Sequence, residues 1–450
     1  MIFLFKNIMS GKINARLKAH NEQKDRMRKK LAFRKGPKKI CLVMIVRNES
    51  KNMKRVLESL EDIIDMGSIV DTGSTDNTEE VILNWSKNNN IPMTVHHESF
   101  KNFAYNRTHS FQIAQKTYPD ADYALLSDAD FVWDNLSFNK NLLVDHKYLI
   151  DQYNKVLTYS NVRLLNMKVN FICKAVTHEF WVEDKQQGYY TGEVRTSKIT
   201  SLLIDDREDG GHKADKFERD ERLLRAALDD PNEPEDLKTR YKFYLGQTLK
   251  DIGNHEESII WYNKRIKDKG WAEELYYAKF QVGFNFEQLA WKTRNAVSIL
   301  IKKDKTEDDL NHIKKYNPNN LDIPSLTIKV KEYFKLAHEN YILAHKFRKC
   351  RSESLYYLTR MYRLLGQNQE SYNIAIIGKK IPYPKDDSLF IERNCYDYLF
   401  HFELSIICYH IAEKFEEGKS HILKLINKNN LPTDIKDVVN NNAKLYNIKM

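Results

Sequence analysis

Residues 40–46 carry a continuous apolar run, Ile-Cys-Leu-Val-Met-Ile-Val, as a strand buried on both faces of a parallel sheet would. Apolar side chains at helical spacing follow at 50–64, and a short strand at 69–70 ends in a turn-rich segment. The alternation continues with a helix around Val81, Ile82 and Trp85, a strand at 93–97, a helix at 104–116 and a strand at 123–127. Because strands and helices alternate throughout this region, the sequence predicts an α/β fold with a mainly parallel sheet and right-handed crossovers.

The carboxyl ends of these strands are where ligand chemistry is expected. Ligands of open parallel sheets bind beyond the strand ends, here at 46–50, 71–76, 97–107 and 127–133. The last of these segments contains Ser127-Asp-Ala-Asp130, whose hard carboxylate oxygens suit Mg²⁺ or Mn²⁺, and such a cation can bridge a diphosphate. An Asp-x-Asp pair is also common in surface turns, so its place directly after an apolar strand is what favours a ligand site.

A second acidic turn, Asp71-Thr-Gly-Ser-Thr-Asp76, follows the preceding strand. Asp71 can accept hydrogen bonds from a ribose or a base, and Gly73 permits a tight turn close to a ligand. The segment can equally be an Asx turn in which Asp76 caps the next helix, and both interpretations can hold together. The sequence has no Gly-x-Gly-x-x-Gly, no Walker loop and no His-Glu-x-x-His, which argues against dinucleotide oxidoreductases, P-loop enzymes and zinc proteases.

From about residue 217 the sequence changes to helical periodicity without strands. One spacing is typical of tetratricopeptide helix–turn–helix repeats, namely Leu245-Gly246, Leu249, Gly253, Ser258 and Tyr262, and Leu358, Tyr362 and Gly366 repeat part of it. Stacked helix pairs leave a concave face that usually takes a partner, although a domain that only braces the first one fits equally. Most aromatic side chains here, including Tyr276-Tyr277 and Tyr356-Tyr357, are expected in the helix core, and exposed ones can stack on sugars.

The net charge of +10 belongs to the N-terminus. Residues 1–40 contain 13 Lys and Arg against 2 Asp and Glu, and the rest of the 450-residue chain is close to neutral. A nucleic-acid enzyme would more often spread its positive charge over a binding face, so no nucleic-acid partner is expected. The basic extension 1–39 is expected to be a solvated helix or tail, or else an anchor to an acidic membrane surface or partner. No apolar run approaches the length of a spanning helix.

Cysteine usage bears on the compartment. The five cysteines are an odd number and include no Cys-x-x-Cys, so neither a disulfide framework nor a zinc site is expected. Of the glycosylation sequons at 48, 84, 106 and 135, two fall in the expected ligand loops, where a glycan would block the site. Together these features predict a reducing, cytoplasmic compartment, with peripheral membrane contact only through the extension.

Four segments together resemble the family-2 glycosyltransferases, which have the GT-A nucleotide-sugar fold. They are 40–50, 69–76, Asn102-Phe-Ala-Tyr-Asn-Arg107 and 123–130, and their order and spacing make the resemblance specific. It is strongest to the subgroup in which this domain precedes tetratricopeptide repeats, and the segments 177–181, 209–220 and 355–357 extend it. The resemblance covers about residues 40–420, and the first 39 residues and an insertion near 292–330 fall outside it. The chain is therefore predicted to consist of a basic extension at 1–39, a GT-A domain at 40–216 and a helical repeat domain at 217–450 that contains the insertion.

By position, the resemblance implies a site for a nucleotide sugar. Asp71 would hold the uridine or ribose, Asp128 would contact the ribose or the metal, and Asp130 would ligate the divalent cation. Arg107 would lie beside the nucleotide, since a planar cation can pair with phosphate or stack on a base, although it can also be an ordinary helix-surface arginine. Further nucleotide contacts would come from the segment after the first strand, at Val46, Asn48 and Glu49.

The same resemblance points to His178-Glu179 on the acceptor side. Inverting transfer needs a base that removes the acceptor hydroxyl proton, and Glu179 is expected in that role. Alternatively His178 is the base or a metal neighbour and Glu179 orients it. His212 could supply a third metal ligand or contact the diphosphate. Lys216 and Arg219 could steady the departing diphosphate, or they could form the solvated face of a helix.

The sequence therefore predicts a metal-dependent inverting glycosyltransferase that uses Mn²⁺ or Mg²⁺. It would move a sugar from a nucleotide-sugar donor, expected to be a UDP-sugar, to a hydroxyl on a protein or glycan, with the repeats shaping the acceptor cleft or recruiting the acceptor or a protein partner. The competing hypothesis is a non-catalytic repeat scaffold with a decayed α/β domain. The intact acidic positions argue against decay: Asp71, Asp128, Asp130 and Glu179.

Overall fold

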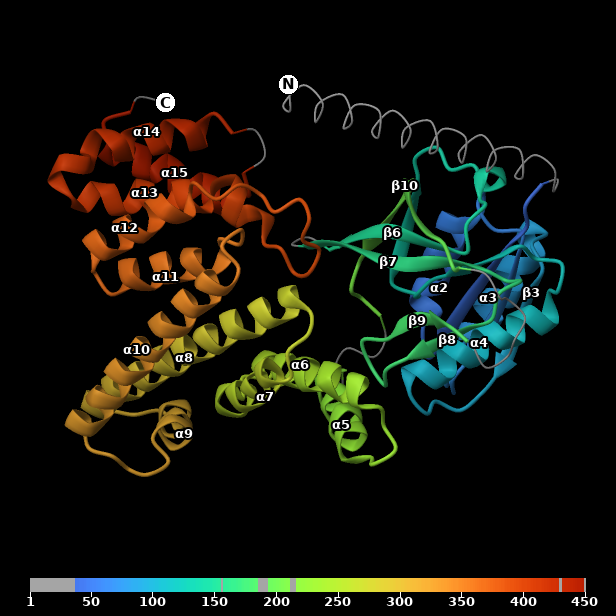
Figure 1. Ribbon diagram of the computed structural model, residues 1–450, viewed down its shortest axis with the longest axis horizontal. Helices are drawn as coiled ribbons and strands as arrows, with labels where there is room; N and C mark the ends of the chain where they lie inside the picture. The colour runs from blue at the N-terminus through green and yellow to red at the C-terminus, as the bar shows by residue number, and fades with distance from the viewer. Residues whose placement is uncertain (1–36, 155–156, 185–192, 211–215, 429–430, 449–450) are drawn as a thin grey trace, which may run out of the picture. The chain divides into compact units, whose positions relative to one another are not determined.

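A computed structural model describes residues 37–154, 157–184, 193–210, 216–428 and 431–448 (Figure 1). The chain separates into two compact units, 1–216 and 217–450, each of which is described by itself. Nearly all of the basic extension lies outside the described residues, so its expected roles stay predictions. None of the described helices combines the length and the apolar composition that crossing a bilayer requires.

The described part of the first unit is built on an eight-stranded mixed sheet, with strand order β3-β2-β1-β4-β7-β6-β10-β5. Its strands are β1 (Ile40–Val46), β2 (Met66–Asp71), β3 (Met93–His97), β4 (Tyr123–Leu126), β5 (Phe131–Asn135), β6 (Lys147–Asn154), β7 (Leu157–Asn166) and β10 (Thr196–Asp206). β1 runs parallel to β2 and β4, β2 runs parallel to β3, and β10 runs parallel to β6. β7 pairs antiparallel with β4 and β6, as does β5 with β10. A separate hairpin consists of β8 (Phe171–Lys174) and β9 (Phe180–Glu183).

β1 is buried on both faces, as its continuous apolar run requires. Alternate residues Ile40, Leu42 and Met44 belong to one core with side chains of α2 (Ser50–Leu60) and α3 (Thr78–Asn89). Cys41 and Val43 belong to a second core on the other face, with side chains of α4 (Phe103–Thr117). Helices therefore cover both faces of the parallel part of the sheet, and its strand ends are left open for loops.

The predicted fold class, a mainly parallel α/β domain followed by an all-α domain, is confirmed, with some element boundaries shifted. The helix expected at 50–64 ends at Leu60, whose carbonyl accepts backbone hydrogen bonds from Ile63 (2.9 Å) and Ile64 (3.1 Å). The strand expected at 69–70 already begins at residue 66. Its first half includes Gly67 and Ser68, which are buried without being apolar, and a Cβ on Gly67 would stand 2.1 Å from Met93 Sδ. Close packing against Met93 requires glycine at position 67. The first half of the strand therefore lacks the apolar side chains by which a strand is recognised in the sequence.

In the second unit, all regular structure of the described residues is helical. Its α-helices are α5 (Lys216–Asp229, which begins one residue before the unit), α6 (Glu235–Asp251), α7 (His255–Lys267), α8 (Ala272–Ile301), α9 (Glu307–Tyr316), α10 (Ile323–Phe347), α11 (Glu353–Leu364), α12 (Asn368–Gly378), α13 (Phe400–Ile407), α14 (Phe415–Ile426) and α15 (Thr433–Leu445). A π-helical turn at Cys395–Leu399 leads into α13. α8 and α10 pack along one another, and α9 lies against α8 (Figure 1). The end of α8, α9 and the start of α10 make up the segment 292–330, whose origin as an insertion stays a prediction.

Two helix pairs of this unit are built alike. Ser258 Oγ on α7 donates to the carbonyl of Gly246 on α6 (2.6 Å), and at the same offset Ser371 Oγ on α12 donates to the carbonyl of Thr359 on α11 (2.7 Å). Both turns contain a glycine with positive φ, +79° at Gly253 and +74° at Gly366, where a side chain would be strained. The spacing noticed in the sequence thus corresponds to a repeated helix–turn–helix structure, and its membership of the tetratricopeptide class stays a prediction.

Candidate active site

The loops that follow β1 and β2 are tied together at the edge of the sheet. The carbonyl of Val46, the last residue of β1, accepts hydrogen bonds from Thr72 N (2.9 Å) and Thr72 Oγ1 (3.1 Å). Asn48 has a left-handed backbone with φ of 54°, its N–H donates to Ser74 Oγ (2.9 Å), and its Oδ1 accepts from Thr75 N (2.7 Å). These bonds fix the two loops that carry the residues predicted to contact the nucleotide.

Asp71 is the last residue of β2, and only 4% of its surface is exposed. Its Oδ1 accepts hydrogen bonds from the backbone N–H groups of Gly73 (2.9 Å) and Ser74 (2.7 Å), which is an Asx turn. No hydrogen bond from any described residue reaches Oδ2. Asp76 Oδ1 accepts a bond from the N–H of Thr78, the first residue of α3 (3.1 Å), although the N-cap position itself is held by Asn77, which makes no side-chain cap bond. In Asp71 one carboxylate oxygen, Oδ1, therefore stabilises the turn, and the other, Oδ2, remains available to a ligand.

The side chains of Arg107, Asp128 and Glu179 form a partly buried ion cluster. Arg107 on α4 donates from Nη2 to Asp128 Oδ1 (2.7 Å) and from Nε to Glu179 Oε1. Arg163 on β7 donates from Nη1 to the other oxygen of Asp128 (3.2 Å) and lies over the ring of Phe131. Burial by itself would raise the pKa of Asp128, but the two arginines hold it at about 2. Asp128 is therefore ionised and fixed in place on both of its oxygens.

The β8–β9 hairpin places Glu179 against Arg107. Hydrogen bonds fix the hairpin to α4: Cys173 N donates to Thr108 Oγ1 (2.8 Å), Thr108 Oγ1 donates to the carbonyl of Cys173 (3.5 Å), and Phe103 N donates to the carbonyl of Val176 (3.3 Å). In the loop between the strands Ala175 and His178 have positive φ values of 77° and 51°, which side chains other than glycine adopt rarely. This strained loop ends at Glu179, the residue before β9, so its carboxylate reaches the arginine.

A second cluster, which we call the Asp130 cluster, contains the carboxylates of Asp130, Glu49 and Asp206. Burial raises the pKa of Asp130 to about 7, and the negative charges of Asp128, Asp206 and Glu49 contribute to the shift. Burial likewise raises the pKa of Asp206, whose Oδ2 accepts from Tyr159 OH (3.3 Å). Asp130 forms no ion pair with a described residue. Carboxylates that repel one another in a partly buried site favour either a proton or a cation between them.

The loop after β10 lies over this cluster and is fixed to α2. Arg55 makes a two-fold bond with Asp209, from Nη1 to Oδ2 (2.8 Å) and from Nη2 to Oδ1 (2.6 Å). Asn52 Nδ2 donates both to the carbonyl of Asp209 (3.2 Å) and to Glu49 Oε2 (3.0 Å). The next residue is Gly210, and a Cβ there would stand 3.4 Å from Asp130 Oδ2 and 3.4 Å from Glu49 Oε1.

Gly210→Ala is therefore expected to disturb the cluster without disturbing the fold. The added methyl group has room at ordinary contact distance, so the free energy of unfolding should change by less than about 0.5 kcal/mol. Because the methyl group fills space between two carboxylates, the rate of the reaction at this site should fall roughly tenfold or more. Turnover and melting temperature of the variant, measured side by side, test this. A variant as active as the wild type would contradict it.

Several predicted residues contribute less to this picture. His212 lies outside the described residues. Lys216 is exposed at the first position of α5, and Arg219 contacts the neighbouring Asp220 (3.4 Å), so their predicted diphosphate contacts stay predictions. Sequence reasoning missed Arg163, Asp206 and Arg55. An arginine inside the apolar strand pattern of residues 162–165 was the one available signal for Arg163.

The donor set of the Asp130 cluster fits a hard divalent cation, because carboxylate oxygens are the ligands that Mg²⁺ and Mn²⁺ prefer. Both oxygens of Asp128 already accept from arginines, so Asp130 and Glu49 are better placed as ligands than Asp128. Among the described residues no group of three His, Cys, Asp or Glu side chains forms a complete metal site. Water and substrate oxygens usually complete the coordination of such cations.

Comparison with known proteins finds one similarity to a family. Residues 41–142 match the family described as Glycosyl transferase family 2, and this segment holds Asp71, Arg107, Asp128 and Asp130. This part of the first unit is therefore similar to family-2 glycosyltransferases, which supports glycosyltransferase activity. The match covers less than a quarter of the chain and ends before Arg163 and Glu179.

Two solved structures were also found to be similar to this chain. The crystal structure of S. aureus TarS 1-349 is 13% identical, with a TM-score of 0.29, and covers 68% of this chain and 91% of that chain. The crystal structure of S. aureus TarS 1-349 in complex with UDP is 13% identical, with a TM-score of 0.28 and the same 68% and 91% coverage. These values describe a weak overall likeness. No protein of curated function matches the sequence.

Proposed function

We propose that this protein is a metal-dependent inverting glycosyltransferase that moves a sugar from a UDP-sugar to a hydroxyl group of a protein or glycan. The observation that carries the proposal is the Asp130 cluster. Asp130 follows β4 and Glu49 follows β1, both inside the segment that matches the glycosyltransferase family, and Asp206 ends β10. A partly buried group of carboxylates at a strand end is where a cation would face a donor diphosphate.

On the donor side, Asp71 Oδ2 would accept a hydrogen bond from the ribose or the base, because Oδ1 is already used in the turn. Asn48 and Val46 would shape the nucleotide pocket, because their hydrogen bonds hold the loops after β1 and β2 together. Arg107 would lie beside the nucleotide with its guanidinium fixed by two carboxylates. These groups bind and orient the donor, which lowers the barrier by keeping the anomeric carbon in place for attack.

Asp130 and Glu49 would hold Mn²⁺ or Mg²⁺, with Asp206 nearby and His212 as a candidate further ligand. The cation supplies charge neutralisation for the leaving nucleoside diphosphate. The raised pKa of Asp130 supports this assignment, since its carboxylate gains most from a nearby positive charge.

On the acceptor side, Glu179 would take the proton of the attacking hydroxyl at Oε2, because Oε1 accepts from Arg107. His178, one residue earlier in the strained loop, is the alternative base. Variants separate these roles: Glu179→Gln should remove turnover if Glu179 is the base, whereas His178→Asn should remove it if the histidine is. The helical unit would recruit the acceptor, and Lys216 and Arg219 are proposed to meet the departing diphosphate.

Calorimetry with UDP tests the proposal directly. UDP is expected to bind in the presence of Mn²⁺ and at least about tenfold more weakly in the presence of a chelator, since the cation neutralises the diphosphate. A non-catalytic scaffold would show no metal-dependent nucleotide binding. Equal affinity with and without Mn²⁺ would exclude the metal-dependent donor site, and incubation with a panel of nucleotide sugars would then identify the donor among those that release nucleotide.

A further inference from the structure

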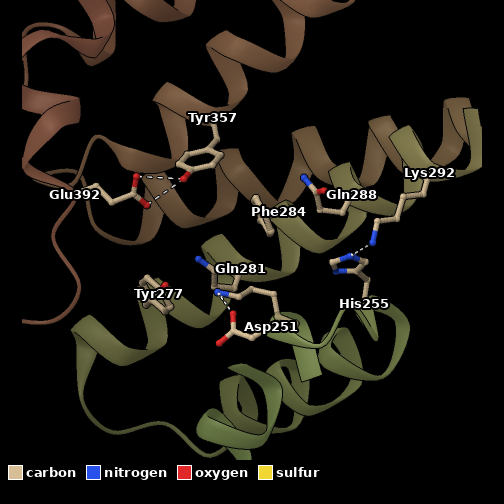
Figure 2. Close-up of a pocket in the computed structure, with 11 residues that line it drawn as sticks. Asp251, His255, Tyr277, Gln281, Phe284, Gln288, Lys292, Tyr357 and Glu392 are labelled. Carbon is tan, nitrogen blue, oxygen red and sulfur yellow. Dashed lines mark hydrogen bonds and ion pairs between the residues drawn. The ribbon is translucent and has the colours of Figure 1, made fainter. Parts of the chain in front are cut away.

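The helical unit contains a pocket of about 440 Å³ that is formed entirely by its own residues (Figure 2). One wall is a stripe along α8 whose members recur every three or four residues and so share one face of the helix, namely Tyr277, Gln281, Phe284, Gln288 and Lys292. The other walls come from the end of α6, the start of α7, α11 and the segment before the π-helical turn. A volume of this size is typical of a site for one small molecule.

Aromatic rings supply the apolar part of the pocket. Tyr277, Phe284 and Tyr357 line it, and the rings of Phe284 and Tyr357 meet edge to face with centroids 5.8 Å apart. Tyr276 and Tyr356, their neighbours in sequence, are buried in the helix core. Tyr277 is also largely buried, at 8% exposed, so only part of its ring borders the pocket. Such rings offer flat faces to the C–H groups of a ligand.

The charged groups of the pocket are already paired. Lys250 Nζ lies 3.1 Å from Asp251 Oδ1, and Lys292 Nζ lies 2.8 Å from His255 Nε2. His255 also bonds through Nδ1 to Asn285 Oδ1 (2.7 Å), and burial lowers its pKa to about 4, so its ring is neutral and Nε2 accepts from the lysine. Burial and the nearby Glu353 raise the pKa of Glu392 to about 7. These pairings leave a lining that is polar but close to balanced in charge.

One polar atom of the lining lacks a partner. Gln281 is 4% exposed, and its Oε1 accepts no hydrogen bond from any described residue. A buried acceptor without a donor destabilises the folded protein, so such atoms are rare unless a ligand or water completes them. In Figure 2 Gln281 lies in the middle of the lining, between Tyr277 and Phe284 along α8. A ligand in the pocket that brings a hydrogen-bond donor to this amide would satisfy the buried acceptor.

We propose that this pocket binds one sugar ring of a hydroxyl-rich ligand. A sugar presents a C–H face to aromatic rings and hydroxyl groups that both donate and accept, which matches the rings of Tyr277 and Phe284 and the amides of Gln281 and Gln288 that alternate along α8. A strongly charged ligand would have to break the Lys250–Asp251 ion pair or the hydrogen bonds of Lys292 and Glu392. The inference goes beyond the proposed transfer reaction, because binding here needs neither donor nor turnover.

The test is titration of the full chain with the methyl glycosides of glucose, galactose, mannose and N-acetylglucosamine, followed by calorimetry or ligand-observed NMR. At least one glycoside is expected to bind, and Gln281→Leu is expected to weaken it about tenfold, the equivalent of one lost neutral hydrogen bond. Failure of all four to bind, or unchanged affinity in Gln281→Leu, would overturn the proposal. Competition by inorganic phosphate would also overturn it, because it would indicate an anion site.

A matched control is available in Gln247 on α6, whose Oε1 is likewise without a hydrogen bond from described residues but which does not line the pocket. Gln247→Leu should leave glycoside affinity unchanged, and a parallel loss in both variants would count against the pocket. Both variants should melt no lower than the wild type, since each removes a buried unpaired acceptor. Binding of UDP with Mn²⁺ should be the same in all three proteins, which separates this proposal from the proposed transferase function.

Discussion

Asp130→Asn is expected to lower kcat/KM for sugar transfer about a thousandfold, since a ligand to the cation that neutralises the leaving diphosphate is worth several kcal/mol. The amide keeps the size of the carboxylate but removes the charge that the neighbouring acids already make unfavourable. For the same reason the melting temperature should stay the same or rise at neutral pH. Donor turnover and differential scanning calorimetry measure the two effects.

The matched control is Asp134→Asn, four residues further along and exposed on β5. It should leave both turnover and melting temperature unchanged, because exposed carboxylates away from a site contribute little. If Asp130→Asn retained wild-type kcat/KM, neither the metal role of Asp130 nor the location of the site at this strand end would hold.

The local pattern of apolar residues was sufficient to predict the parallel strands β1 to β4 of the sheet. β1 and β4 are apolar throughout, and the loops after β1, β2 and β4 lie where alternation of strands and helices placed them. The strands from β5 onward were not predicted, because β6, β7 and β10 mix apolar with many polar residues. Their places in the sheet depend on pairings such as β4 with β7 and β5 with β10, which join segments far apart in sequence and leave no local signal in either one.

The difference between local sequence patterns and pairings of distant strands also explains which site residues could be predicted from the sequence. Asp71, Asp128 and Asp130 stand in short motifs directly after apolar strands, so the sequence alone placed them at one edge. Asp206 joins Asp130 because β10 pairs antiparallel with β5, which sets Asp206 opposite Phe131. Arg163 reaches Asp128 because β7 lies next to β4. Both contacts depend on strand pairings that are distant in sequence, and no motif records them.

Arg107→Met is expected to lower the free energy of unfolding by about 3 kcal/mol at neutral pH, because it leaves the carboxylates of Asp128 and Glu179 without their shared cation. Arg163 would remain for Asp128, but its bond is longer, 3.2 Å against 2.7 Å. Arg107 is 15% exposed, so water cannot replace it fully. Arg207→Met is the matched control, since this arginine is half exposed and pairs with Asp205 (2.8 Å), a contact worth at most about 1 kcal/mol.

The pH dependence of the stability loss in Arg107→Met is a more specific test than the magnitude of that loss. In the wild type the pKa of Asp128 is about 2, below the ordinary value of 3.8, so its contribution to stability is complete above pH 4 and disappears as the pH falls towards 2. Without Arg107 the Asp128 carboxylate protonates more readily, which relieves its burial at low pH. The melting temperatures of wild type and variant should therefore converge between pH 4 and pH 2. A difference that stayed constant or widened as the pH fell would mean that Arg107 acts through packing and not through its two carboxylates.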